Sequence, residues 1–176
     1  GNEQNLVTAD KYFDVEIDGS WASADTTAVT IHNYTTDATR YINIYTTATA
    51  RHKGVYSTSY YLLLVNGQCI ELGQAVLNIT ITGLQLDGST DVYILAWATT
   101  APTTVIATFN SNILIGPSSR GFFATCGNDT VIYFYNNIIY NMSGYGIRLG
   151  PSGGASALVY IYNNTIRNST VAIGIG

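Results

Sequence analysis

The chain has 176 residues, of which 47% are hydrophobic and only 10% charged, against about 25% charged residues in an average domain. The net charge is −4 and the seven Lys and Arg residues are scattered, which excludes the basic surface that nucleic-acid binding requires. No apolar run approaches the roughly 20 residues of a membrane-spanning helix, so we expect no membrane span. The chain opens on Gly1 rather than Met, which indicates a mature or excised piece.

The residue types predict an all-β fold. Tyr supplies 14 residues, and Val, Ile and Thr, which also favour strands, are abundant. Gly and Asn favour the turns between strands, whereas Lys, Glu, Gln and Leu are too scarce to build long helices. A chain of this length can bury one sizeable core, so we expect a single domain over residues 1–176.

The first predicted strand lies in the segment "FDVEIDG", in which apolar and acidic residues alternate. Alternation places the two sets on opposite faces of a strand. We expect the apolar set to point inward and the acidic set outward: Phe13, Val15 and Ile17 against Asp14, Glu16 and Asp18. Three acids on one face could bind calcium, or they could form the solvated face of an exposed strand. We favour the solvated face and assign no metal and no cofactor.

Three further strands are predicted in the first 76 residues, separated by turns: "TRYINIYTTA" (39–48), "SYYLLLVNG" (59–67) and "CIELGQAV" (69–76). Their spacing is irregular. Residues 1–75 are therefore expected to form either irregular first coils of the architecture derived below or a β cap that protects one end of it.

A repeat occupies residues 76–176 in four copies. Each copy has an alternating apolar strand, a two-residue break, a second short strand, a turn rich in Gly, Ser and Asn, and a third strand. One large apolar residue follows each break, at separations of 28, 25 and 27 residues: Leu86, Leu114, Ile139 and Ile166.

A single coil of this kind cannot bury its inward side chains, but coils stacked about 4.8 Å apart pair like strands with like. The repeat therefore predicts a single-stranded right-handed parallel β-helix (solenoid), with irregular N-terminal coils and four regular coils over residues 76–176. Each break needs a residue that tolerates a left-handed backbone, as Asn and Gly do. The breaks hold such residues: Thr82-Gly83, Asn110-Ser111, Tyr135-Asn136-Asn137 and Tyr162-Asn163-Asn164. We expect the stacked Asn side chains to form hydrogen bonds from coil to coil.

The segment "GSWASADTTAVTIHNYTTDATRYINIYTTATARHKGVYSTSYYLLLV", followed by "ITITGLQL", resembles the opening of right-handed parallel β-helix repeat proteins of phage and metagenomic type. The match covers roughly residues 6–86, and "TTDATRYI…RHKG" is its most specific part. Members of the family usually have more coils and a longer N-terminus than this chain. The resemblance implies a β-helix in a tailspike-like or surface protein of a virion or cell, and it implies no particular reaction.

β-Helix folds host polysaccharide-cleaving enzymes, and glycoside hydrolysis needs two carboxylates that face one groove. Asp87 and Asp91 share a turn and could form a groove with Asp129, but no acid follows in the last two coils. Arg51-His52 has no Ser or Cys motif with which to form a hydrolytic triad. We therefore assign no catalytic residue, favour a role other than catalysis and leave enzymatic activity open.

Six N-x-S/T sequons are candidate glycosylation sites: Asn33, Asn78, Asn128, Asn141, Asn163 and Asn168. Their number indicates a secreted protein. Cys69 and Cys126 could pair in an oxidising compartment, although we favour two separately buried thiols.

Four tyrosines alternate with inward residues on two adjacent coils and are expected to face outward: Tyr133, Tyr135, Tyr160 and Tyr162. Three roles remain open for them. They could stack on sugar rings, contact another subunit, or stabilise the sheet by packing on one another.

The chain stops at "VAIGIG", within an apolar third strand, so we expect an uncapped C-terminal end. Ile173 and Ile175 would lie at an open strand edge that favours association. Either the polypeptide continues, or another molecule stacks on this end.

These features favour an extracellular structural protein that is secreted or displayed on a cell surface or virion. We expect a glycosylated fibre or surface element that assembles with copies of itself and associates with glycans. The alternative is a tailspike-like module that binds or degrades polysaccharide.

Overall fold

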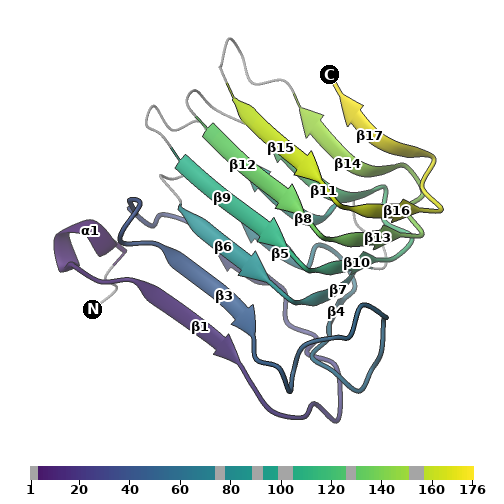
Figure 1. Ribbon diagram of the computed structural model, residues 1–176, viewed down its shortest axis with the longest axis horizontal. Coiled ribbons are helices and arrows are strands. Elements are labelled where there is room, and N and C mark those ends of the chain that lie inside the picture. The colour runs from purple at the N-terminus through teal and green to yellow at the C-terminus, as the bar shows by residue number, and fades with distance from the viewer. Residues whose placement is uncertain (1–3, 74–77, 89–92, 99–104, 126–129, 151–156) are drawn as a thin grey trace.

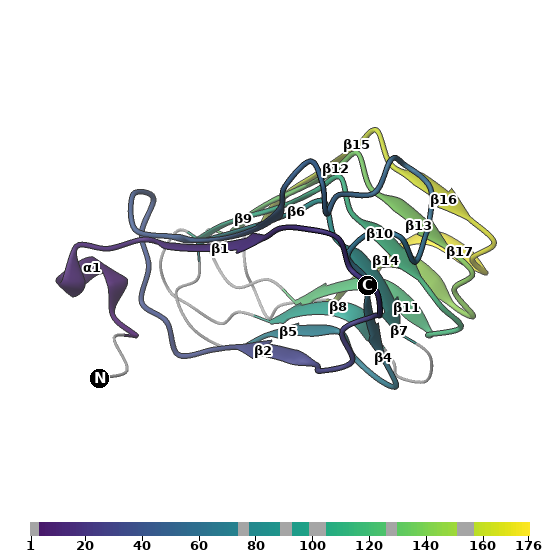
Figure 2. The same ribbon diagram turned by 90° about the horizontal axis from the view of Figure 1, so that it is seen from below.

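The computed structural model describes residues 4–73, 78–88, 93–98, 105–125, 130–150 and 157–176, which form a stack of β-strands (Figure 1). The strands follow one another around the stack, and each strand before the last winding pairs in parallel with the strand one full winding later (Figure 2). We call one winding a coil. The predicted fold class is confirmed: the protein is all-β and forms a parallel β-solenoid.

Three sheets make the walls of the stack. The first sheet contains β1 (Phe13–Ile17), β3 (Ile42–Thr46), β6 (Ile79–Thr82), β9 (Val105–Asn110), β12 (Thr130–Tyr135) and β15 (Leu158–Tyr162). The second contains β4 (Leu63–Val65), β7 (Gln85–Gly88), β10 (Ile113–Ile115), β13 (Ile138–Tyr140) and β16 (Thr165–Arg167). The third contains β2 (Val29–Ile31), β5 (Ile70–Leu72), β8 (Tyr93–Ala98), β11 (Arg120–Thr125), β14 (Tyr145–Gly150) and β17 (Val171–Ile175).

The register of the second sheet is the one that the repeat predicts. Leu86 pairs with Leu114, Leu114 with Ile139, and Ile139 with Ile166. The first three of these side chains are completely buried, because each has a coil above it and a coil below it. The same column continues through Leu63 to Asp25, which pairs with Leu63 by a single bridge.

Aromatic side chains fill the centre of the bore. Phe109 and Phe134 stand in register on the first sheet, and Phe122 reaches them from the third sheet. The ring centroids of Phe122 lie 5.0 Å from Phe109 and 4.6 Å from Phe134, and all three side chains are fully buried. The bore in these coils is thus a packed core.

The corner after each of the first-sheet strands β6, β9, β12 and β15 has the predicted left-handed backbone. The φ angles are positive at Gly83 (82°), Ser111 (56°), Asn136 (57°) and Asn163 (54°). Gly83 has a second constraint, because a Cβ atom there would clash with the Thr46 hydroxyl of the preceding coil. The corner is therefore fixed by backbone conformation and by close packing between coils.

An asparagine ladder runs beside this corner, as predicted. The side-chain oxygen of Asn137 accepts from the backbone N–H (3.0 Å) and the side-chain amide (3.1 Å) of Asn112. Asn112 in turn accepts from the backbone N–H of Leu84 (3.0 Å). Asn112 and Asn137 are buried, and the ladder satisfies backbone groups that the turn leaves without sheet partners.

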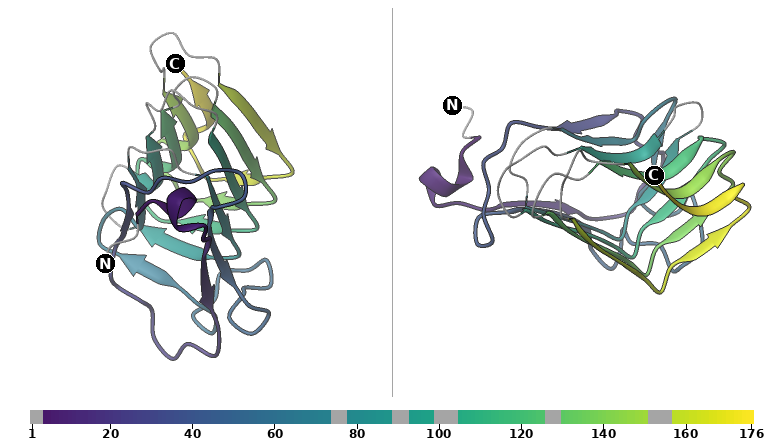
Figure 3. Two further views of the ribbon diagram at one scale, coloured as in Figure 1. Left: turned by 90° about the vertical axis from the view of Figure 1, so that its left-hand side faces the viewer. Right: turned by 90° about the horizontal axis from the view of Figure 1, so that it is seen from above.

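Strands β1 to β5 lie in the same three sheets as the later strands, so the segment before residue 75 continues the stack. Helix α1 (Leu6–Ala9) lies outside it, at the corner between β2 and β3, where Leu6 donates to the Thr35 carbonyl (Figure 3). No helix in the described part of the chain is long and apolar enough to cross a membrane.

Candidate functional site

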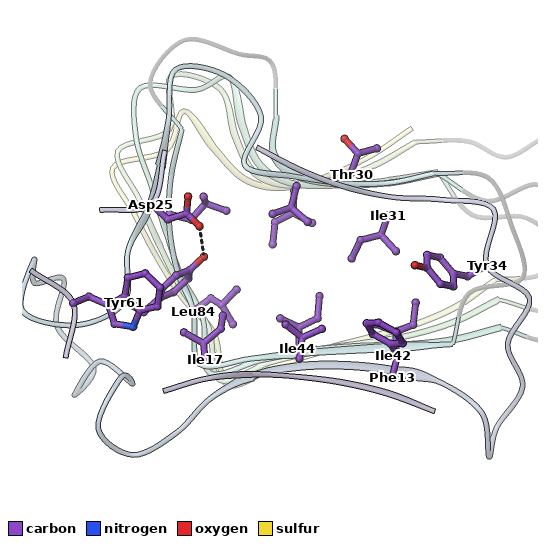
Figure 4. A pocket seen from close by; sticks show the side chains of 15 residues that line it. Phe13, Ile17, Asp25, Thr30, Ile31, Tyr34, Ile42, Ile44, Tyr61 and Leu84 are labelled. Atoms are coloured by element: carbon purple, nitrogen blue, oxygen red, sulfur yellow. Dashed lines mark hydrogen bonds between the residues drawn. The ribbon is translucent and has the colours of Figure 1, made fainter. Parts of the chain in front are cut away.

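The N-terminal coil encloses an apolar cavity of about 360 Å³, which we call the N-terminal mouth (Figure 4). Its walls are the inward faces of β1 and β2 and of the next coil, which contains β3, β4 and β5. Apolar side chains make most of the lining, among them Val15, Ile17, Val29, Ile31, Ile42 and Ile44. Phe13 also lines the cavity, yet 49% of it is exposed, because no described strand pairs with the outer edge of β1. The predicted inward direction of this strand's apolar side chains is confirmed.

Polar groups gather on one wall of the mouth. Tyr61 donates to the Asp25 carboxylate over 3.5 Å, and the ring of Trp21 meets that of Tyr61 edge-on at 4.9 Å. Figure 4 shows Asp25 and Tyr61 together, at the opposite end of the cavity from Tyr34. Burial, followed by the nearby Asp25 charge, raises the pKa of the Tyr61 phenol. The indole N–H of Trp21 is buried with no hydrogen-bond partner in the described structure.

Asp14 and Glu16 on β1 and Asp18 directly after it face outward. Each carboxylate accepts a hydrogen bond from the next coil. The Asn43 amide donates to Asp14 (3.0 Å), and the Tyr45 hydroxyl donates to Glu16 (2.6 Å). This bond is the main reason that the pKa of Tyr45 rises to about 12. We find no cluster of three metal-ligating side chains among the described residues. The acids form one outward row, which we call the acidic row: Asp14, Glu16 and Asp18.

The third acid of that row has the strongest set of donors. Asp18 accepts from the hydroxyls of Thr47 and Thr49. These two bonds, with a bond from the Gly19 N–H, lower the pKa of the Asp18 carboxyl. The side chains that donate to these three carboxylates all lie in the next coil, on one side of β1.

The opposite end of the stack is the C-terminal edge, formed by β15, β16 and β17. In the third sheet Ile147 is fully buried, whereas Ile173, its partner in the next coil, is 44% exposed. Leu149 and Ile175 show the same contrast, at 8% and 80%. The difference arises because no described strand covers the last coil.

The four outward tyrosines stand in two stacked pairs. The rings of Tyr133 and Tyr160 lie 5.1 Å apart at 10°, and those of Tyr135 and Tyr162 lie 4.9 Å apart at 2°. Cross-strand packing is therefore present. Tyr160 and Tyr162 belong to the last coil, so their outer ring faces have no described ring beyond them. At that end, stacking on sugar rings and contact with another subunit both stay open as predictions for the tyrosine pairs.

The sequons occupy different environments. Asn33, Asn141, Asn163 and Asn168 are exposed, and all four have positive φ angles at turns. Asn78 is only 5% exposed; its amide donates to Thr36 (3.3 Å) and its oxygen accepts from the Ile106 N–H (3.0 Å). A glycan has no space there, so Asn78 drops out of the candidate set. Asn128 lies outside the described residues.

Asp87, the acid that the sequence singles out in the repeat, lies on the outer face of β7 and accepts from the Tyr56 hydroxyl (3.1 Å). Burial raises the pKa of this carboxyl, against the hydrogen bond from Tyr56, which lowers it. Its two proposed companions, Asp91 and Asp129, lie outside the described residues. The described part of this region thus holds one half-buried acid next to a phenol, whereas glycoside hydrolysis needs two carboxylates.

Arg51 and His52 serve the loop between β3 and β4. Arg51 donates to the Thr46 carbonyl (2.8 Å), and His52 Nδ1 accepts from the Gly54 N–H (3.1 Å). Since Nδ1 is the acceptor, Nε2 carries the proton and donates to the Ser111 carbonyl (2.7 Å). Through these bonds to backbone groups the two residues hold a turn against the stack.

Cys69 is a buried free thiol, and burial is the main cause that raises its pKa to about 12. Its thiol donates weakly to the Leu63 carbonyl (3.7 Å). Cys126 lies outside the described residues.

The sequence reasoning missed the polar wall of the mouth. Asp25, Trp21 and Tyr61 come from two irregular coils whose loop lengths hide the period. The only available signal was the single acid in "SADTT", which stands where later coils place Leu or Ile.

Comparison with protein-family models, with curated proteins and with solved structures found no match. The fold and the geometry of the two end coils therefore carry the functional argument.

Proposed function

We propose that this chain is an extracellular structural β-solenoid that associates with copies of itself through its end coils. One observation carries the proposal: the inward columns, fully buried in the middle of the stack, end in half-exposed apolar side chains. Ile173 at one end and Phe13 at the other belong to such columns.

Unpaired strand edges add a second driving force. The outer edges of β1 and β15 present backbone N–H and C=O groups that no described strand satisfies. A further parallel strand would satisfy them and remove apolar surface from water at the same time. Few charges oppose such contact, because only 10% of the residues are charged.

Sedimentation velocity of the 176-residue chain at increasing concentration tests this function. We expect the sedimentation coefficient to rise with concentration. The double variant Ile173→Lys, Ile175→Lys should remain monomeric, because two buried charges would disfavour the contact. Ile106→Lys is the matched control, since Ile106 is a comparably exposed apolar residue in the middle of the stack. A wild-type chain that stays monomeric throughout would contradict the proposal.

The extracellular setting has its own test. Expression in a secreting eukaryotic cell, followed by glycosidase treatment, should increase gel mobility by removing glycans from exposed sequons. Asn163→Gln should remove one step of that shift. Asn78→Gln should remove none, since its amide is buried. An unchanged mobility after glycosidase treatment of secreted protein would contradict glycosylation.

A second candidate function is polysaccharide binding, favoured by a shallow cavity of about 210 Å³ on the outer face of the first sheet. Tyr41 and Ile106 supply apolar walls, and Thr80 and Thr108 lie beside them. A sugar ring needs an apolar face to stack on and hydroxyl groups to bond. Titration with neutral and acidic polysaccharides should show binding that Tyr41→Ala abolishes. Equal binding by wild type and variant would exclude this cavity.

A further inference from the structure

We infer that the C-terminal edge of one copy seats on the N-terminal mouth of a second copy in the register that the chain uses between its own coils. In this arrangement β15 pairs with the partner's β1, and β17 with the partner's β2. The inference rests on the proposed function and adds its partner surface and register. Figure 1 shows β1 and β15, the first-sheet strands of these two surfaces, at opposite ends of the stack.

The first sheet fixes the register. Its inward columns run without interruption from β1 to β15, so extending them by one coil assigns each residue of β15 a partner in β1. Val159 falls on Phe13, and Ile161 falls on Val15. Both pairs are apolar, and each would bury side chains that are partly exposed in one chain alone.

The outward columns of the same sheet are complementary in hydrogen bonding. Extending them places Tyr160 on Asp14 and Tyr162 on Glu16. One end thus supplies two phenol donors, and the other supplies two carboxylate acceptors. Within the chain, Tyr45 lies one coil away from Glu16 on the other side of β1 and donates to it at 2.6 Å, so a tyrosine at a spacing of one coil can reach this carboxylate.

The third sheet agrees with the first. Its columns place Ile173 on Val29 and Ile175 on Ile31, two residues that line the mouth. The second sheet gives the one poor match, because Ile166 falls on Asp25. A carboxylate next to an incoming apolar side chain weakens an edge contact without changing its register.

Contacts between identical ends are less favourable. Two mouths face to face would bring two copies of the acidic row together, where like charges repel. Two C-terminal edges would meet with tyrosines on tyrosines and leave both mouths open. The head-to-tail contact repeats at each new end, so it builds a linear filament.

Cysteine cross-linking tests the register. Asp14→Cys and Tyr160→Cys are made separately, each with Cys126→Ser, and mixed with oxidised glutathione. Parallel neighbours about 4.8 Å apart are within reach of a disulfide. Tyr160→Cys mixed with Asp18→Cys is the out-of-register control, because four residues of strand move the thiol by about 13 Å. Glu16→Cys with Tyr162→Cys is a second in-register pair, in case one variant fails to fold.

We expect the in-register pairs to form dimers at least about tenfold faster than the control, since disulfide geometry tolerates little displacement. Association by sedimentation without preferential cross-linking of these pairs would overturn the register and leave self-association standing. Preferential cross-linking of Tyr160→Cys to itself would show a contact between two C-terminal edges and overturn the inference. The absence of both association and cross-linking would overturn the proposed function as well.

Discussion

The side-chain oxygen of Asn164 accepts two hydrogen bonds from Asn137 of the preceding coil, one from its backbone N–H at 2.9 Å and one from its side-chain amide at 3.1 Å. Asn137 repeats the same arrangement toward Asn112. Each of these two Asn side chains thus accepts from both the backbone and the side chain of the Asn in the preceding coil. These bonds hold neighbouring coils together at a corner where the sheet is interrupted.

Replacing Asn137 with Ala should lower the free energy of unfolding by about 2–4 kcal/mol, because it removes the acceptor of the buried Asn112 backbone N–H and amide and a donor to the Phe109 carbonyl. Asn164→Ala is the matched control. Asn164 lies in the last coil and is half-exposed, so water can replace its bonds and we expect a loss of about 1 kcal/mol. Denaturant titration measures both. Equal losses would contradict a buried ladder.

Replacing Ile139 with Asp should prevent folding, because it places a charge in a fully buried column, at a cost comparable to the total stability of about 5–15 kcal/mol. Ile166→Asp lies in the same column at the C-terminal edge, where water reaches it, and should fold with reduced stability. Circular dichroism melting compares the two. An unchanged melting temperature for Ile139→Asp would contradict the coil register.

Protonation of His52 should destabilise the protein. Burial, and to a smaller extent Arg51, lowers the pKa of His52 against the bond to Ser111, which raises it. A group with a depressed folded-state pKa contributes stability above its unfolded pKa of about 6.5 and loses it as the pH falls through the folded value. The free energy of unfolding should therefore fall below about pH 6.5. His52→Gln should remove this component of the pH profile; a profile identical to wild type would refute it.

Asp25→Asn should strengthen self-association by about tenfold, which corresponds to about 1.4 kcal/mol, because it removes the charge that an incoming Ile166 would desolvate. Glu71→Gln is the control. Glu71 is an exposed acid on β5, one coil in from the N-terminal end, and it does not line the mouth, so its replacement changes the net charge equally without removing a charge from the cavity. If both variants associate alike, general charge repulsion is responsible and Asp25 has no specific role.

The regular half of the fold was predictable because its period is short and constant. Leu86, Leu114 and Ile139 recur at nearly equal spacing, and the structure stacks them as expected. The corner residues followed from backbone chemistry, since Asn136 and Asn163 tolerate positive φ.

The mouth was not predictable in the same way. The loop between β3 and β4 separates Thr46 from Leu63 and conceals the repeat in the first coils. Asp25 occupies a column position through one bridge, which alternation within a strand cannot reveal. Tyr133 and Tyr160 were predicted to face outward with three roles open, and the structure shows that their rings stack on each other.

Electron cryomicroscopy of the concentrated 176-residue protein tests head-to-tail assembly most directly. Six coils at about 4.8 Å each predict a filament with an axial rise of about 29 Å per subunit and sheets that continue across every junction. Particles that remain single at all concentrations, or filaments whose subunits alternate in direction, would contradict it.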